Sequence, residues 1–429
     1  MLFRVSMFLF LSSLVGAADL VYVGNKNAGT ISVIDSSIQQ VIATVSLGGL
    51  PSAIAIGINQ AQAYVVNTAN NNISVIDTTN QSVTATIAVG NGPSAIAITP
   101  DNQFAYVCNT SSNSVSVIST ASQSVIATIN VGTGPSAVAT NGTQVYVTNQ
   151  QDNTVSVINI GSQTVIATLS VGTSPTSVAA TPNGSQVYVG NQNSISVINT
   201  NTLAVTSISI NPYTGSALVI TPDSSFVYAC SYNDGIVEVI RVSSQSVIST
   251  INVGGFGAGT DAMIISPDGS SVYVSNGDSS SVSVISVASQ SIVATISLAV
   301  GDTPAALGIT SNGSLIYVAS SNTNNVQVFN TSNYSLLTTI PVGSYPGVIG
   351  VAAPNAASAL SANGSAITAT QQSLQLTNSA TANALNDVQT TGIFSAAQGT
   401  FPDLLNPHII DNSVPYTQET NLPPVWCSH

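Results

Sequence analysis

The sequence predicts an all-β protein, a β-propeller of four-stranded antiparallel blades. Three observations support this class: a tyrosine-anchored unit recurs every 40–45 residues, each unit holds four short runs rich in β-branched residues, and turn residues separate the runs. One such sheet leaves apolar side chains uncovered on both faces, and radial repetition covers them. A linear β-solenoid is the alternative, but its coils are usually shorter and lack hairpin turns.

Each unit has the same order of runs. The anchor tyrosines are Tyr22, Tyr64, Tyr106, Tyr146, Tyr188, Tyr228, Tyr273 and Tyr317. A second alternating run follows, as at residues 73–77, and in a third, such as residues 125–131, apolar residues recur with period two, which is strand spacing. A fourth run starts at proline or glycine, as at residues 93–99. Turns such as Pro267-Asp268-Gly269 supply the backbone angles that tight reversals need.

The number of runs predicts eight blades. The first unit lacks a preceding proline run, and the last unit ends with an unclaimed one at residues 346–352. Adding that run to those near Val21, Ile31 and Val41 completes a composite blade, which closes the ring and hides its edges. Seven blades, with one unit packed outside the ring, is the alternative.

The repeated unit resembles a known family. Its runs read Tyr-Val-x-Asn, Val-Ser-Val-Ile-Asp, Val-Ile-Ala-Thr-Ile-x-Val-Gly and Pro-Ser-Ala-Ile-Ala, and Tyr146-Val-Thr-Asn149 matches the tetrapeptide of the YVTN-type β-propeller repeat. The resemblance covers residues 19–353. That family includes archaeal surface-layer proteins and bacterial periplasmic propellers, so the resemblance implies a propeller outside the cytoplasm and leaves its activity open.

The two ends of the chain differ from the repeats. Residues 1–17 combine Arg4, an apolar run and small residues, which predicts a signal peptide; a buried or membrane-anchoring helix is the alternative. Residues 354–429 are predicted to be a low-complexity tail, partly helical or irregular. The mature protein is expected to be extracytoplasmic (secreted, periplasmic or at the cell surface) with no integral membrane segment after signal cleavage.

Charge and composition exclude several kinds of site. The chain has 3 Lys+Arg against 16 Asp+Glu, a net charge of −13, which lacks the basic surface that nucleic-acid binding requires. No metal site or cofactor is expected, because the acids of the repeats are scattered and both histidines, His408 and His429, lie in the tail. Cys108 and Cys230 occupy equivalent positions three blades apart, so they are expected to be buried thiols; the state of Cys427 is left open.

The stretch from 208 to 265 departs most from its siblings and carries the candidate ligand site. Tyr213 and Phe256 offer stacking surfaces there, and Asp234 or Asp261 offers a hydrogen-bond acceptor. Glu238 and Arg241 are close by in sequence. Drift in a tolerant loop is the alternative explanation of this stretch.

These observations favour a non-enzymatic exported propeller that acts as a cell-surface or extracellular scaffold or adhesion protein, with no catalytic residues. The alternative is a periplasmic or secreted propeller that recognises a glycan or peptide at one rim. A lactonase-like hydrolase comes third, because a lactonase site needs clustered charged groups and the repeats hold one lysine and one arginine, Lys26 and Arg241. The expected partner is a protein or glycan.

Overall fold

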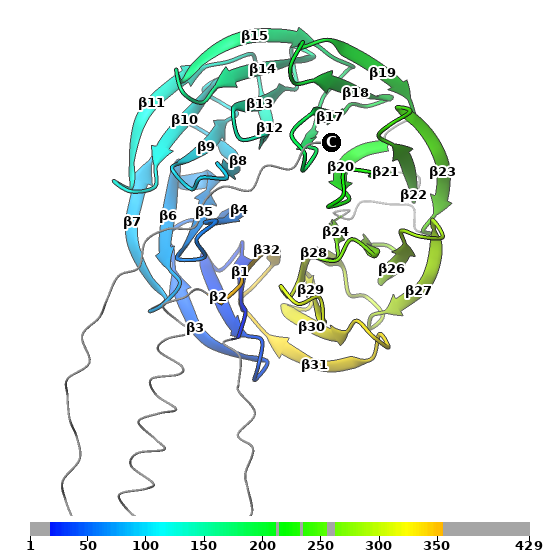
Figure 1. Ribbon diagram of the computed structural model, residues 1–429. Coiled ribbons are helices and arrows are strands. Elements are labelled where there is room, and N and C mark those ends of the chain that lie inside the picture. The colour runs from blue at the N-terminus through cyan, green and yellow to red at the C-terminus, as the bar shows by residue number, and fades with distance from the viewer. Residues whose placement is uncertain (1–17, 212–213, 232–234, 255–261, 355–429) are drawn as a thin grey trace, which may run out of the picture. The chain divides into compact units, whose positions relative to one another are not determined.

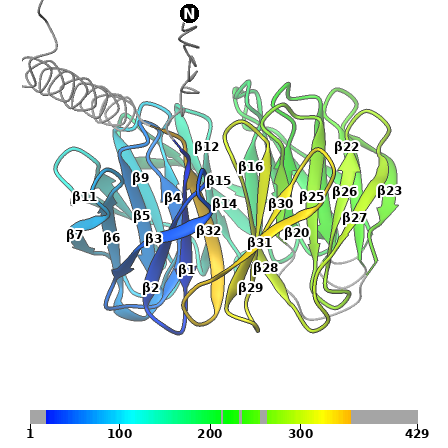
Figure 2. The ribbon, with the colours of Figure 1, turned by 90° about the horizontal axis from the view of Figure 1, so that it is seen from below.

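The computed structural model describes residues 18–211, 214–231, 235–254 and 262–354, which form eight four-stranded antiparallel sheets. The sheets stand as blades in a ring (Figure 1), and the strands run between the two faces of the ring (Figure 2). The predicted all-β propeller of eight blades is confirmed, and the seven-blade alternative is wrong.

We number the blades in chain order and letter their strands A to D from the centre of the ring outward. Blade 1 contains β32 (Pro346–Ala352), β1 (Leu20–Asn25), β2 (Thr30–Asp35) and β3 (Gln40–Ser46); blade 2 contains β4 (Pro51–Ile56), β5 (Gln62–Asn67), β6 (Asn72–Asp77) and β7 (Ser82–Ala88). Blade 3 contains β8 (Pro93–Ile98), β9 (Phe104–Asn109), β10 (Ser114–Ser119) and β11 (Ser124–Asn130); blade 4 contains β12 (Pro135–Thr140), β13 (Gln144–Asn149), β14 (Thr154–Asn159) and β15 (Thr164–Ser170). Blade 5 contains β16 (Ser177–Ala180), β17 (Gln186–Gly190), β18 (Ser194–Asn199) and β19 (Val205–Ser209); blade 6 contains β20 (Thr214–Ile220), β21 (Phe226–Ser231), β22 (Ile236–Arg241) and β23 (Ser246–Asn252). Blade 7 contains β24 (Met263–Ile265), β25 (Ser271–Asn276), β26 (Ser281–Ser286) and β27 (Ser291–Ser297); blade 8 contains β28 (Pro304–Ile309), β29 (Leu315–Ser320), β30 (Asn325–Asn330) and β31 (Leu336–Pro341).

Blade 1 is built from both ends of the repeat region. Strand β32 pairs antiparallel with β1, with Gly350 opposite Tyr22, while Val33 of β2 lies opposite Tyr22 on the other side. The predicted closure by residues 346–352 is therefore confirmed. It removes the open edge that β1 would otherwise present to other chains.

The core consists of eight apolar clusters, and each fills the space between two neighbouring blades. The anchor tyrosines contribute the largest side chains, and Tyr146 is fully buried among valines of blades 4 and 5. On the A strands, isoleucines and alanines alternate: Ile54 and Ile56 contact the blade 1 side, and Ala53 contacts the blade 3 side. This alternation lets neighbouring A strands approach closely at the narrow centre of the ring.

The turns define two faces that matter for function. The A–B and C–D turns leave the ring on one face, which we call the A–B face, and the B–C turns and D–A connections leave on the other, the B–C face. The C–D turns place one residue in the left-handed region in every blade: Gln39, Gln81, Gln123, Gln163, Leu203, Gln245, Gln290 and Tyr334. The N–H of Gln81 donates to the Asp77 carbonyl at 2.9 Å, which closes its turn.

The described residues contain one short 3-10 helix, η1 (Thr68–Asn70), and none of their helices is long and apolar enough to cross a membrane. The predicted signal peptide, residues 1–17, and the predicted tail beyond residue 354 lie outside the described residues.

Candidate binding site on blade 6

A buried pair of polar side chains recurs near the B–C face. In six blades, an asparagine at the end of strand B donates its Nδ2 to a serine Oγ on strand C at 2.9–3.0 Å. The pairs are Asn25–Ser32, Asn67–Ser74, Asn109–Ser116, Asn149–Ser156, Asn191–Ser196 and Asn276–Ser283. The bond gives the buried Nδ2 group of each asparagine a partner, so this recurring pair belongs to the scaffold.

A glycine on the preceding blade makes room for five of these six asparagines; the exception is Asn276, where a Cβ added at Gly254 would meet nothing within 4 Å. A Cβ added at Gly132 would lie 2.6 Å from Cγ of Asn149, and Gly90 stands in the same relation to Asn109. The Val-Gly ending of strand D in the repeat is thus explained by the neighbouring blade.

Blade 6 exchanges all three residues. Ser231 replaces the asparagine, Glu238 replaces the serine, and Asn211 replaces the glycine of the preceding blade. The backbone N–H and Nδ2 of Asn211 both donate to Oε1 of Glu238, at 3.1 Å and 2.7 Å. The amide donor of blade 6 is therefore Asn211, at the end of strand D of blade 5. In the six blades with the repeated pair, the donor is an asparagine at the end of strand B of the same blade.

Glu238 is left with an unsatisfied oxygen. Its side chain is 3% exposed, and no described residue donates to Oε2. Burial raises the pKa of Glu238, while the two bonds from Asn211 lower it by a smaller amount.

Blade 8 also has a different residue at the position of Glu238, and there the buried carboxylate has hydrogen-bond partners for both of its oxygens. Nε2 of Gln327 donates to Oδ2 of Asp302 at 2.6 Å, and Oγ1 of Thr323 donates to Oδ1 at 2.6 Å. Both oxygens of this buried carboxylate therefore have partners, which indicates a structural role for Asp302. Glu238 keeps one oxygen without a partner among the described residues, as do Asn25, Asn67, Asn109, Asn149 and Asn191 of the repeated pair at Oδ1.

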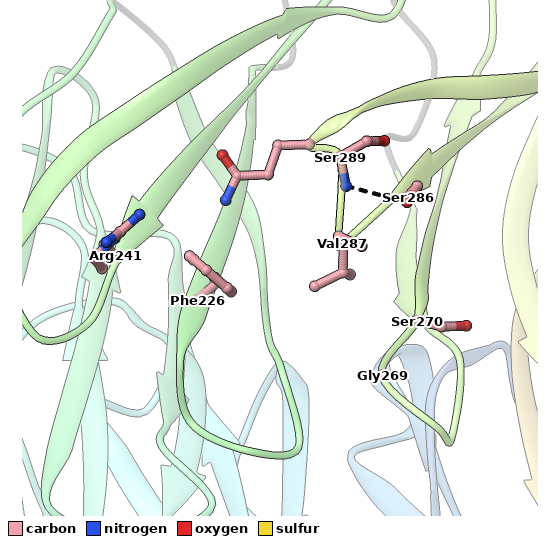
Figure 3. A pocket seen from close by; sticks show the side chains of 9 residues that line it. Phe226, Arg241, Gly269, Ser270, Ser286, Val287 and Ser289 are labelled. Carbon is pink, nitrogen blue, oxygen red and sulfur yellow. Dashed lines mark hydrogen bonds between the residues drawn. The ribbon is translucent and has the colours of Figure 1, made fainter.

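A groove opens on the A–B face between blades 6 and 7, with a volume of about 640 Å³. Phe226 and Arg241 form one wall, and the A–B and C–D turns of blade 7 form the other, with Ser270, Ser286, Ser289 and Gln290. Figure 3 shows Phe226 and Val287 facing each other across it. The Arg241 Cζ lies 5.9 Å from the centre of the Phe226 ring, within the range of a cation–π contact.

The groove results from two replacements at paired positions. Phe226 and Arg241 lie opposite each other in the β21–β22 pairing, where blade 2 has Gln62 and Asp77. In blade 2, Gln62 accepts a hydrogen bond from the Tyr64 hydroxyl at 2.6 Å. Phe226 offers no such acceptor, and the Tyr228 hydroxyl has no partner among the described residues. Burial raises the Tyr228 pKa to about 12, so this hydroxyl stays protonated at neutral pH.

All four residues of the predicted ligand site lie outside the described residues. Tyr213 directly precedes β20, Asp234 lies between β21 and β22, and Phe256 and Asp261 lie between β23 and β24. The site predicted from these four residues therefore stays a prediction. Glu238 and Arg241 come from the same stretch of sequence. Arg241 ends β22 at the A–B face, while Glu238 is the third residue of that strand, nearer the B–C face.

Phe226 was missed at the sequence level. The residue two positions before the anchor tyrosine is glutamine in blades 2, 4 and 5 and phenylalanine in blades 3 and 6, and only in blade 6 does an arginine lie opposite the phenylalanine.

The two described cysteines lie in the core of the ring. Cys108 and Cys230 are fully buried, as predicted, and burial raises the pKa of Cys108 well above its usual range. Within the part of the chain that the structure describes, no group of three or more His, Cys, Asp or Glu side chains is placed to hold a metal ion.

Comparison with known proteins supports the fold and leaves the activity open. Residues 57–165 and 243–340, just under half of the chain, match a family model described as lactonase, 7-bladed β-propeller. The ring found here has eight blades rather than seven. No curated protein matches the chain.

Several solved structures are similar in fold. Hydrazine synthase from Kuenenia stuttgartiensis is 21% identical with a TM-score of 0.54, over 66% of this chain and 96% of that one. The dihydro-heme d1 dehydrogenase NirN is 14% identical with a TM-score of 0.68, over 77% of this chain and 74% of that one. AztD from Citrobacter koseri is 13% identical with a TM-score of 0.62, over 78% and 98%. At these identities the likeness is one of fold alone.

Proposed function

We propose that the chain is an exported, non-enzymatic β-propeller that acts as a scaffold or adhesion protein outside the cytoplasm and recognises a neutral glycan in the groove between blades 6 and 7. The observation that carries the proposal is the Arg241–Phe226 pair. It places a cation and an aromatic ring in one groove of an otherwise repetitive, cation-poor ring. The YVTN-like unit and the predicted signal peptide support the extracytoplasmic location.

The lining of the groove fits a sugar. The Phe226 ring offers an apolar surface to the C–H face of a pyranose, and the guanidinium, the serine hydroxyls and the Gln290 amide offer hydrogen bonds to its hydroxyl groups. A net charge of −13 repels acidic ligands at long range, which favours a neutral sugar over a uronic acid.

The groove binds rather than converts its ligand. Arg241 is the only titratable residue among those that line it, so none of the serine hydroxyls has a general base beside it in the groove. Recognition without chemistry suits a surface or adhesion protein.

The test is a glycan array probed with the full-length chain, followed by titration of the strongest neutral ligand. Arg241→Gln should weaken binding at least tenfold, because the guanidinium supplies the charged hydrogen-bond donors of the groove. Ser119→Gln changes the equivalent position of blade 3 and should leave binding unchanged. Equal binding by the wild type and Arg241→Gln would contradict the proposal.

Lactone hydrolysis is a second candidate, favoured by the family-model match over residues 57–165 and 243–340. A panel of sugar and homoserine lactones distinguishes the two. We expect no turnover above the uncatalysed rate, and saturable turnover would replace the binding proposal with an enzymatic one.

A further inference from the structure

Asn-x-Ser/Thr triplets are frequent in the chain, and several stand in exposed turns. The described residues contain eight, beginning at Asn72, Asn80, Asn109, Asn141, Asn183, Asn312, Asn330 and Asn333. In an exported protein, this triplet is the acceptor sequence for N-linked glycans. Four of the asparagines, Asn80, Asn183, Asn312 and Asn333, are exposed.

These four share one local geometry. In each, the side-chain Oδ1 of the asparagine accepts the backbone N–H of the serine two residues later at 3.0 Å, and accepts the hydroxyl of that serine at 2.6–2.8 Å. Because a backbone N–H only donates, the atom that it meets is the oxygen, which fixes the orientation of the amide. The Nδ2 of these four asparagines donates to no described residue.

The four asparagines gather on one face of the ring. Asn183 and Asn312 lie in A–B turns of blades 5 and 8, and Asn80 and Asn333 lie in C–D turns of blades 2 and 8. All four therefore belong to the A–B face. The sequence between residues 192 and 311, which forms both walls of the groove, contains no such triplet. Glycans at the four positions would leave the turns that line the groove unmodified.

We propose that Asn80, Asn183, Asn312 and Asn333 are N-glycosylation sites of the mature protein. The donor is a lipid-linked oligosaccharide and the catalyst is a membrane oligosaccharyltransferase of the secretory route. The Nδ2–C1 bond forms, the bond between C1 and the lipid phosphate oxygen breaks, Nδ2 loses one proton, and the lipid phosphate leaves. The proposal rests on the export part of the proposed function.

A buried triplet provides an internal control. Asn109 begins Asn-Thr-Ser but is 0% exposed, and its Nδ2 donates to Ser114 at 3.2 Å and to Ser116 at 3.0 Å inside blade 3. A glycan would take the place of one of the two hydrogens of this nitrogen, so one of these two bonds would be lost, and the folded blade has no space for the sugar. The folded, secreted protein should carry no glycan at Asn109.

The test directs the full chain into the secretory pathway of yeast and maps the glycopeptides of the folded, secreted product by mass spectrometry. We expect glycans at the four exposed asparagines and none at Asn109. Ser185→Ala should remove the glycan of Asn183 alone, and Ser185→Thr should retain it. Because the host supplies export, the result does not depend on the native location of the chain, which fractionation of the native host measures separately.

Four unmodified exposed asparagines in the secreted chain would overturn the proposal, and so would a glycan at Asn109 in folded protein. If one of the four asparagines carried no glycan, the proposal would be wrong for that asparagine.

Discussion

Asp19 and Ser311 hold the two ends of the repeat region together. The Asp19 carboxylate accepts the Ser311 backbone N–H at 2.6 Å and the Ser311 hydroxyl at 2.8 Å, which ties the residue before β1 to the A–B turn of blade 8. On the other side of blade 1, the Ala353 N–H donates to Oε1 of Gln60 at 2.9 Å, beside blade 2. The composite blade is thus bonded to both of its neighbours.

Truncation tests this closure. A chain ending at residue 345 lacks β32 and leaves the edge of β1 unpaired, so its unfolding should lose cooperativity. The loss should be comparable with the whole stability of an ordinary domain, about 5–15 kcal/mol. A chain ending at residue 359 keeps β32 and should melt as the full chain does. Calorimetry of both truncations makes the measurement, and an undiminished melt of the shorter chain would disprove the closure.

Gly132→Ala should destabilise the ring. The added Cβ would lie 2.6–2.8 Å from the Asn149 side chain, which is fixed by its bonds to Thr154 and Ser156. Overpacking of this kind costs about 1–3 kcal/mol. Gly161→Ala is the matched control, since its Cβ would meet nothing closer than 3.5 Å. Denaturant titration compares the two free energies of unfolding, and equal values would show that the glycine is not required by its neighbour.

Glu238→Gln should change how stability depends on pH. The folded-state pKa of Glu238 is raised from 4.5, so in the window just above that value the folded chain binds more protons than the unfolded chain. The wild type should therefore lose stability relative to Glu238→Gln as pH rises through this window. The four aspartates whose pKa is lowered by hydrogen bonds, such as Asp101, act equally in both proteins. A difference in unfolding free energy that stays constant from pH 4 to 8 would contradict the raised pKa.

The two described thiols should be unreactive in the folded protein. Cys108 and Cys230 are fully buried, and burial keeps Cys108 protonated at neutral pH. In a Cys427→Ser chain, a thiol reagent should label no cysteine under native conditions and two after unfolding. Rapid native labelling would show that blades 3 and 6 open locally.

The repeats explain why so much of the fold could be predicted from the sequence. Comparison of the eight copies locates the strands, the turns and the missing A strand of blade 1, because each copy has the same kinds of residue at the same positions. The period-two pattern of residues 125–131, for example, matches β11 with its alternating exposure. Composition alone also explains the scarcity of charged clusters.

Contacts between blades were harder to predict. The Asn211–Glu238 bond joins residues 27 positions apart on different blades. Its position in the fold can be understood only by comparison with blades 3 and 4, where Gly132 leaves space for the side chain of Asn149. Arg241 could be noticed in the sequence because of its charge. Its partner Phe226 lies opposite it on the neighbouring strand, and the repeat pattern does not indicate this contact. The proposed ligand site is therefore built from the described residues Phe226 and Arg241, and the site at Tyr213, Asp234, Phe256 and Asp261 stays a prediction.

Glycan binding in the groove is tested by hydrogen–deuterium exchange of the full chain with and without a saturating neutral glycan from the array. We expect added protection in the turns at residues 268–271 and 286–290 and around Arg241, which line the groove between blades 6 and 7. The equivalent turn of blade 4, residues 159–163, should exchange at the same rate in both samples. Protection confined to the B–C face, around Asn211 and Glu238, would contradict the account.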